Sequence, residues 1–219
     1  MTILFDLDGT LDRLRGRPLL ELRMLRRGAA RFAGVIPRHR FHHAFWRAAR
    51  TMQVHGTSRT NHQVLTTGLA LASGRPEPEI AGLLDDMVAG DFTRMGWHFQ
   101  PMPGAREALL RVRAAGHRVV LATNPVWPER AVRQRLAWGG LGDVPFDLIT
   151  HSQLMTRCKP DTNYYREVLA RLSARPEDCA MIGDNPRKDL PARDVGIRTF
   201  LLGRRATWAD LDLWLRSAA

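Results

Sequence analysis

Short apolar runs alternate with longer stretches of mixed polarity along most of the 219-residue chain. Five of these runs are rich in apolar and β-branched residues over five or six positions, which is typical of strands buried on both faces. They cover residues 2–6, 118–123, 146–150, 179–183 and 197–201. We expect each run to form one strand of a sheet.

Stretches with apolar residues at helical spacing lie between these runs, over residues 104–115, 128–138, 162–173 and 186–195. Three of them are followed by a glycine, a residue that commonly ends helices, at Gly116, Gly139 and Gly196. Strands that alternate with amphipathic helices predict an α/β fold. We expect a Rossmann-like, mostly parallel sheet with helices on both faces.

Residues 14–98 break this alternation because they contain no convincing strand. Their pattern predicts four helices, over residues 18–33, 38–53, 61–72 and 77–93. The α/β alternation resumes after the Pro/Gly-rich segment 100–104. The interpretation is a catalytic core formed by residues 1–13 and 99–219, with an inserted all-helical cap domain over residues 14–98.

Carboxylates follow two of the predicted strands. Asp6 and Asp8 come at the end of the first run, and because they are two residues apart in an extended chain, they point the same way. Asp184 follows the run 179–183, with Asp189 five residues later, and Thr123 ends the run 118–123. The carboxyl ends of parallel strands meet at one edge of a sheet. Oxygen ligands from separate strands at that edge favour a Mg²⁺ site.

Four motifs occur in order along the core: Phe-Asp-Leu-Asp-Gly-Thr-Leu at 5–11, Thr123, Lys159-Pro160-Asp161, and Gly-Asp-x-x-x-x-Asp at 183–189. This set resembles the haloacid dehalogenase (HAD) superfamily of hydrolases, over residues 1–13 and about 99–219. The position of the helical insert, after the first motif, resembles the subgroup that includes phosphoglycolate phosphatase-like enzymes.

The resemblance implies a role for each acidic residue. Asp6 would be the nucleophile that forms an aspartyl-phosphate, and Asp8 the general acid and then the general base. Mg²⁺ would bind the carboxylate of Asp6, the backbone carbonyl of Asp8 and Asp184. Asp189 would be a further ligand or would act through water.

The resemblance also implies that Thr123 and the backbone N–H of Asn124 hold phosphate oxygens, and that Lys159 offsets the charge of Asp6 and the phosphoryl group. Composition supports the role of Lys159. Of the 33 basic residues, 31 are arginines, and the two lysines, Lys159 and Lys188, fall within or beside the motifs. An ammonium group differs from a planar guanidinium in shape and in the way it binds anions.

The formal net charge of +11 is concentrated in one segment. Residues 15–59 contain eleven arginines and one acid, Glu21, a net charge of +10. One interpretation is a solvated basic helix face. The other is a cap that raises the potential over a phosphate site, with Arg40, His43 and Arg47 as candidate substrate contacts at helical spacing.

These observations favour a Mg²⁺-dependent phosphatase acting on a small phosphorylated metabolite. A phosphotransferase or phosphomutase with the same site is an alternative. Another is a nucleic-acid binder or polynucleotide-end phosphatase using the basic segment, although its apolar residues fall at spacing typical of packing. Asp8 argues against a dehalogenase because a halide leaving group needs no proton.

The sequence has no apolar stretch of membrane-spanning length and no secretory signal, so no membrane partner is expected. Its two cysteines, Cys158 and Cys179, cannot build a disulfide framework. We expect a cytoplasmic protein with reduced thiols, either a monomer or a homodimer.

Overall fold

Five parallel strands form the central sheet of the structure, a computed structural model that describes residues 1–203 and 206–216. The strand order is β5-β4-β1-β6-β7, with β1 in the centre. The strands are β1 (Thr2–Phe5), β4 (Arg118–Leu121), β5 (Leu148–Ile149), β6 (Cys179–Gly183) and β7 (Arg198–Leu201). The predicted α/β fold with a parallel sheet is confirmed, and each of the five apolar runs contains one strand.

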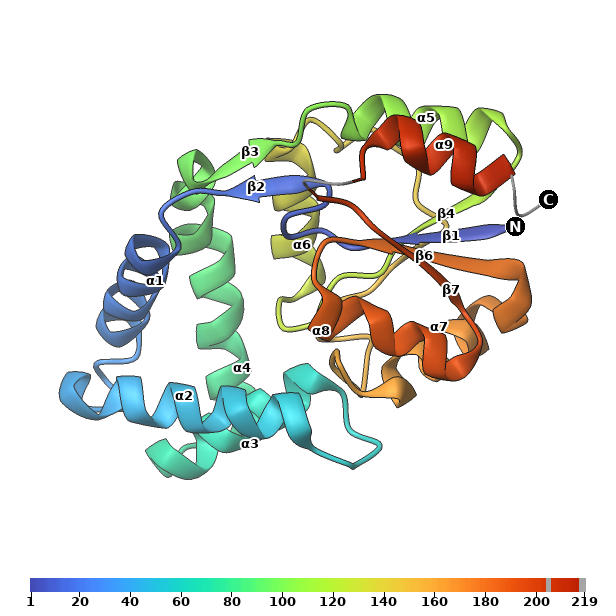
Figure 1. The fold of residues 1–219 in the computed structure, drawn as a ribbon. Coiled ribbons are helices and arrows are strands. Elements are labelled where there is room, and N and C mark those ends of the chain that lie inside the picture. The colour runs from blue at the N-terminus through green and yellow to red at the C-terminus, as the bar shows by residue number, and fades with distance from the viewer. Residues whose placement is uncertain (204–205, 217–219) are drawn as a thin grey trace.

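Helices cover both faces of this sheet (Figure 1). On one face, Ile3 and Phe5 pack against α5 (Ala105–Ala114), α6 (Glu129–Trp138) and α9 (Trp208–Arg216). On the other face, Leu4 packs against α7 (Thr162–Leu172). Alternate residues of β1 therefore serve opposite layers, as the two-residue period of a strand requires.

The predicted helix over residues 186–195 is shorter in the structure. It consists of α8 (Pro186–Asp189) followed by a 3-10 turn (Leu190–Val195). Pro191 lies inside this segment, and because proline has no backbone N–H it interrupts the hydrogen-bond ladder of an α-helix.

The insert after the first strand is helical, as predicted, and lies to one side of the sheet (Figure 1). It contains α1 (Arg17–Arg31), α2 (Arg38–Val54), α3 (Asn61–Ser73) and α4 (Glu77–Asp86), and α4 runs on into a π-helical turn (Met87–Asp91) and a 3-10 helix (Phe92–His98). These helices share a buried apolar core, which also includes Phe99 of β3 (Phe99–Pro101) and Ala131 of α6. None of the helices within the described residues is long and apolar enough to cross a membrane.

A two-stranded antiparallel ribbon connects the insert to the sheet, and the sequence pattern does not reveal it. It consists of β2 (Asp12–Leu14) and β3 (Phe99–Pro101), with Leu14 opposite Phe99. Three-residue strands are too short to show a two-residue period. The predicted domain limits at 13/14 and 98/99 fall within or next to this ribbon, and they stay a prediction. Residues 204–205 and 217–219 of the predicted core lie outside the described residues.

Candidate active site

Three carboxylates meet at the carboxyl edge of the sheet. Asp6 follows β1, Asp184 follows β6, and Asp189 is the last residue of α8. One oxygen from each lies within 4.8 Å of the others. Asp6 and Asp189 are buried, and Asp184 is more exposed. Their convergence is the arrangement predicted from the strand ends.

Lys159 lies inside this cluster and is itself buried. Its Nζ donates to Oδ1 of Asp6 at 2.9 Å and to Oδ1 of Asp189 at 2.7 Å. Burial raises the pKa of Asp6 to about 6, and the Lys159 ammonium opposes this rise. Burial also acts to lower the pKa of Lys159, but Asp6 and Asp189 outweigh it and keep that pKa above its ordinary value. The structure thus brings together Lys159 and Asp6, as the sequence suggested.

Two glycines allow the backbone to approach these carboxylates closely. Gly9 has a φ of +83°, in the left-handed region, and a Cβ there would collide with the carboxylate of Asp184. A Cβ on Gly183 would collide with the carboxylate of Asp189. The Gly-Thr step and the Gly-Asp step of the motifs are therefore needed for space around the cluster.

Asp8 lies beside the cluster and pairs with an arginine that the sequence analysis did not single out. Arg135, on the buried side of α6, donates to Asp8 and to Oδ2 of Asp12, the latter at 2.8 Å. Its side chain is 2% exposed, and its guanidinium lies 4.8 Å from the centre of the Phe99 ring. Burial acts to raise the pKa of Asp8, but Arg135 outweighs it, so the pKa is lowered.

Asp12 is the most buried partner of Arg135. Its side chain is 0% exposed, and burial raises the pKa of its carboxyl to about 7 even though Arg135 opposes this. Among 31 arginines, the one sequence signal for Arg135 is its position between Val132 and Leu136, on the apolar side of a predicted helix.

Thr123 and Asn124 follow β4 at the same edge of the sheet. The Thr123 carbonyl accepts a hydrogen bond from the Tyr164 hydroxyl at 2.9 Å, and Asn124 Oδ1 accepts one from the backbone N–H of Lys159 at 3.1 Å. Asn124 lines the cavity described next, whereas Thr123 is buried and is not among the lining residues.

A cavity of about 540 Å³ extends from the carboxylates to the insert helices. Asp6, Asp8 and Asp184 line it at the sheet end, together with Arg135 and Asn185. Ser152 also lines it, and the buried Oγ of this residue has no hydrogen-bond partner among the described residues. The volume of the cavity falls within the range of small-molecule sites, roughly 300–1,000 Å³.

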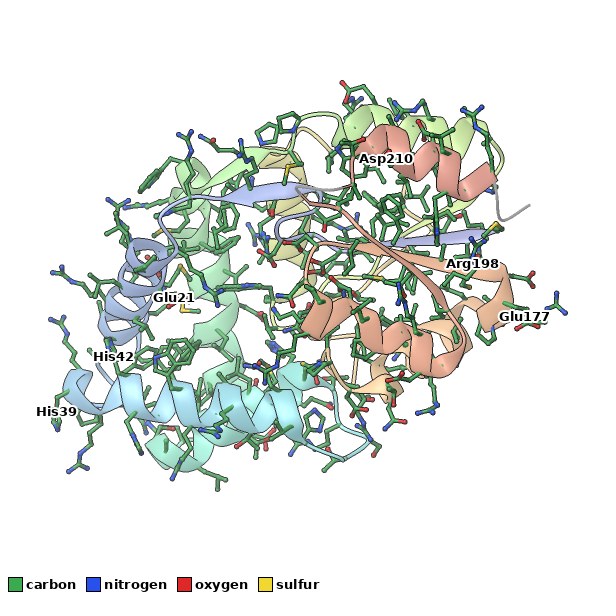
Figure 2. The ribbon with its side chains drawn as sticks, viewed as in Figure 1. Glu21, His39, His42, Glu177, Arg198 and Asp210 are labelled. Atoms are coloured by element: carbon green, nitrogen blue, oxygen red, sulfur yellow. The ribbon has the colours of Figure 1, made fainter. Side chains whose placement is uncertain are left out.

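The three candidate substrate contacts on the insert do not face this cavity. Arg40, His43 and Arg47 are exposed on α2 and are not among its lining residues. Phe41 and Phe45 of the same helix line it instead. Figure 2 shows His39 and His42 at the end of α2 away from the sheet. The structure therefore does not bring these three residues to the cavity, because spacings of three and four describe either face of a helix equally well, and here they describe the outer one.

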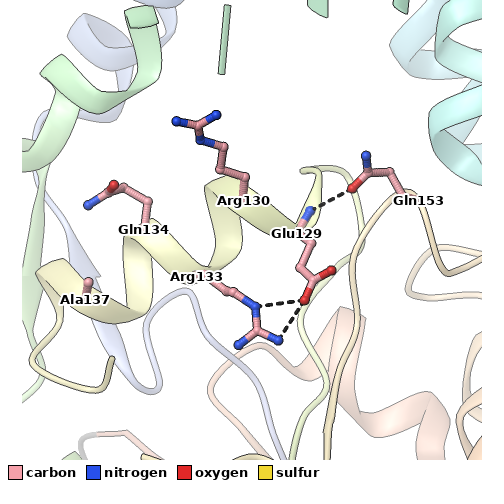
Figure 3. A pocket seen from close by; sticks show the side chains of 6 residues that line it. All are labelled: Glu129, Arg130, Arg133, Gln134, Ala137 and Gln153. Atoms are coloured by element: carbon pink, nitrogen blue, oxygen red, sulfur yellow. Dashed lines mark hydrogen bonds and ion pairs between the residues drawn. The ribbon is translucent and has the colours of Figure 1, made fainter. Parts of the chain in front are cut away.

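A second hollow, on the outer surface of α6, is not part of this site (Figure 3). Arg133 pairs there with Glu129 at 2.7 Å, and the Glu129 backbone N–H donates to Gln153. These groups satisfy one another, which is typical of a solvated helix face.

Comparisons with known proteins agree with this geometry. A profile of the haloacid dehalogenase-like hydrolases matches residues 1–193. A phosphoserine phosphatase of Thermus thermophilus is 35% identical over 126 residues, and a glyceraldehyde 3-phosphate phosphatase of Pyrococcus furiosus is 30% identical over 123 residues. These matches cover 58% and 53% of this chain and 47% of each relative, so the chain spans about half the length of the curated relatives it matches.

Solved structures show the same fold. A HAD phosphatase from Thermococcus onnurineus aligns with a TM-score of 0.59 at 20% identity, covering 98% of this chain and 97% of its own. The protein CbbY of Rhodobacter sphaeroides, in complex with phosphate, aligns with a TM-score of 0.55 at 21% identity, covering 95% and 90%. At this identity the likeness concerns the fold alone, whereas the profile covers most of the sequence. The chain belongs to the family of haloacid dehalogenase-like hydrolases.

Proposed function

We propose that the protein is a Mg²⁺-dependent phosphatase that hydrolyses a small phosphate monoester through an aspartyl-phosphate on Asp6. The observation that carries this proposal is Lys159 Nζ between Asp6 and Asp189, with Asp184 beside them. Asp6 and Asp184 of this group line the cavity. An ammonium group at this position favours the binding of a phosphoryl dianion next to an anionic nucleophile.

The donor set fits the metal. Asp6, Asp184 and Asp189 offer only oxygen atoms, and these lie within 4.8 Å of one another. Carboxylate oxygens suit hard cations such as Mg²⁺. We assign the Asp6 and Asp184 carboxylates and the Asp8 backbone carbonyl as ligands, with Asp189 as a further ligand or a partner through water. The bound ion would supply charge neutralisation between the nucleophile and the phosphoryl oxygens.

The reaction then needs two transfers. An oxygen of Asp6 attacks phosphorus, the bond from phosphorus to the ester oxygen breaks, and Asp8 gives its proton to the leaving oxygen. Asp8 next takes a proton from water, whose oxygen attacks phosphorus and releases inorganic phosphate and the Asp6 carboxylate. Arg135 favours the ionised Asp8 needed for the second transfer. For the first transfer Asp8 must be protonated. A bound phosphate dianion raises the pKa of Asp8, because a nearby negative charge favours the neutral acid.

Phosphate oxygens are assigned to Lys159 Nζ, the Thr123 side chain and the Asn124 backbone N–H. This part of the proposal rests on the position of all three at the carboxyl edge of the sheet. The helical insert after β1 supports the subgroup of phosphoglycolate phosphatase-like enzymes. The curated relatives, both named as phosphatases of small metabolites, support a small phosphorylated metabolite as substrate.

The test of the nucleophile and the metal is hydrolysis of acetyl phosphate, a small phosphoryl donor whose acetate leaving group needs no proton from Asp8. Asp6→Asn should lower turnover by at least about a thousandfold because the amide is not a nucleophile. Asp143→Asn, the same change at an exposed ion pair with Arg106, is the matched control and should retain wild-type turnover. EDTA should stop hydrolysis, and added Mg²⁺ should restore it. Wild-type turnover in Asp6→Asn would show that the nucleophile is assigned wrongly.

A phosphotransferase remains a second candidate because the same carboxylates could pass the phosphoryl group to a hydroxyl instead of water. The two are separated by adding a polyol and measuring whether phosphate appears free or on the polyol.

A further inference from the structure

Beyond the carboxylates, the 540 Å³ cavity continues between the insert helices, where its wall is largely apolar and includes the polar side chains of Arg17, Glu21, Gln53 and His62. Each of the four helices contributes buried side chains to this wall, among them Met24, Phe41, Met52, Leu65 and Leu84. These residues also belong to the apolar core of the insert. The cavity that begins at the carboxylates therefore extends into the apolar core of the insert, where side chains ordinarily fill the space between helices.

Apolar groups also line the cavity from the side of the sheet. They come from Phe99 in β3 and from Val126 and Trp127 in the segment before α6. The Trp127 ring packs against Phe92 at 5.0 Å between centroids, so neighbouring side chains hold it in place. On the insert side, the rings of Phe41 and Phe45 stack at 5.8 Å. Rings fixed in this way form a surface suited to an apolar ligand.

Charge is sparse on this wall. Among the described residues that line the cavity from the insert, the charged ones are Arg17 and Glu21, which pair with each other at 2.8 Å. Their side chains are 73% and 42% exposed, so they lie toward solvent. A leaving group with an ammonium or carboxylate that extends between the insert helices would lose water there without gaining a buried counter-charge, which is unfavourable. Arg135, a buried cation that lines the cavity, lies at the sheet end and is already paired with Asp8 and Asp12.

We propose that the substrate is a phosphate monoester of an apolar alcohol, whose hydrocarbon part occupies the cavity between the insert helices. This inference rests on the proposed phosphatase function and narrows it. The phosphoryl group lies against Asp6 and Lys159, and the hydrocarbon part contacts the wall formed by Met24, Phe41 and Met52. The reaction releases an alcohol of low polarity, whereas the names of the curated relatives indicate small polar alcohols.

The test is kcat/KM of the full chain with Mg²⁺ for ethyl, butyl and hexyl phosphate. The acidity of the leaving alcohol is nearly constant along this series, so the trend reports binding of the chain. We expect kcat/KM to rise about fourfold for each added methylene, because burying one methylene contributes ~0.8 kcal/mol to binding. Phosphoserine and glyceraldehyde 3-phosphate should be poorer substrates than hexyl phosphate.

Acetyl phosphate separates the failure of this inference from the failure of the function. Hydrolysis of acetyl phosphate with no rise along the alkyl series would overturn the apolar substrate and leave the phosphatase in place. The same holds if phosphoserine exceeds hexyl phosphate. No hydrolysis of acetyl phosphate or of any alkyl phosphate would overturn both.

A pair of variants on α2 gives an independent readout. Phe45 is half-buried and lines the cavity, so Phe45→Gln is expected to fold and to place an amide in the apolar wall. It should lower the ratio of kcat/KM for hexyl over ethyl phosphate by about tenfold. Arg50→Gln, on the exposed side of the same helix and outside the cavity, should leave this ratio unchanged. An unchanged ratio in Phe45→Gln would overturn the assignment of the wall.

Discussion

Arg135 joins α6 to β2 through a buried ion pair, and replacing it gives the sharpest test of how this part of the fold is stabilised. Arg135→Met keeps an unbranched side chain of similar length against Phe99 but removes the positive charge. Asp12, which is 0% exposed, then keeps a carboxyl group without a counter-charge. Removing one partner of a buried pair costs about 3–5 kcal/mol. That is a large share of a typical unfolding free energy of about 5–15 kcal/mol.

The loss should depend on pH with a defined sign. The pKa of Asp12 rises from 3.8 in an ordinary environment to about 7 on folding, so folding takes up a proton there. Stability from this group is therefore greatest below pH 4 and falls as the pH rises through 7. A pKa shift of three units changes the contribution of Asp12 to the unfolding free energy by about 4 kcal/mol between pH 4 and pH 7. Without Arg135 the pKa of Asp12 rises further. At pH 5 the acid is neutral with or without Arg135, so the loss should be about 1 kcal/mol smaller there than at pH 8.

The assay is urea denaturation at pH 5 and pH 8 with EDTA present, followed by tryptophan fluorescence and by circular dichroism. Arg133→Met is the matched control, because Arg133 lies on the exposed side of the same helix (Figure 3) and its i,i+4 pair with Glu129 is worth about 0.5 kcal/mol or less. In the double variant Arg135→Met/Asp12→Asn, about 2 kcal/mol or more of the loss should be recovered. Equal losses at both pH values, or a double variant no more stable than Arg135→Met, would refute this account.

Three further predictions concern separate contacts. Lys159→Arg should lower turnover of acetyl phosphate at least about a hundredfold, with the circular dichroism unchanged, because a planar guanidinium does not fit between Asp6 and Asp189 as an ammonium does. Burial raises the pKa of Cys158 to about 12, so at pH 8 its thiol should react with a disulfide reagent about a thousandfold more slowly in the folded protein than in urea. Asn61→Leu removes the hydrogen bond from Nδ2 to the Pro125 carbonyl at 3.2 Å and should cost about 1–3 kcal/mol in urea denaturation.

Much of the fold could be predicted because its elements are long enough to show a period. The apolar run at 179–183 becomes β6 without a change of bounds. The insert helices differ from prediction by no more than two residues at every end except the C-terminal end of α4, which stops at Asp86 where the helix was expected to reach residue 93. The ribbon of β2 and β3 could not be predicted, because three residues carry no periodic signal. It depends on pairing between segments that are about 85 residues apart, and such pairing is not visible locally.

The residues of the site also divide into those that could be predicted from the sequence and those that could not. Asp6 and Asp184 could be found because they directly follow strands, and the topology of a parallel sheet brings strand ends together. Lys159 and Asp189 could be found because they belong to short motifs that resemble those of a known family. Arg135 could not, because its role depends on the packing of α6 against β2, over 120 residues earlier in the chain. A buried arginine and a surface arginine look alike in a sequence that contains 31 of them.

The basic segment shows why charge along a sequence is a poor guide to charge at a site. Residues 15–59 carry a net +10, but the structure sets later acids against them. Arg27 and Arg31 pair with Asp91, and Arg59 pairs with Glu77. The predicted cap, 14–98, therefore carries a net +7, and several of its arginines lie on the outer side of α2. Such charges can attract an anion from a distance through the summed field, which salt weakens. The inner face of α2 lines the cavity with largely apolar side chains, among them Phe41 and Met52, so we expect any contact with the substrate on that face and not at the outer arginines.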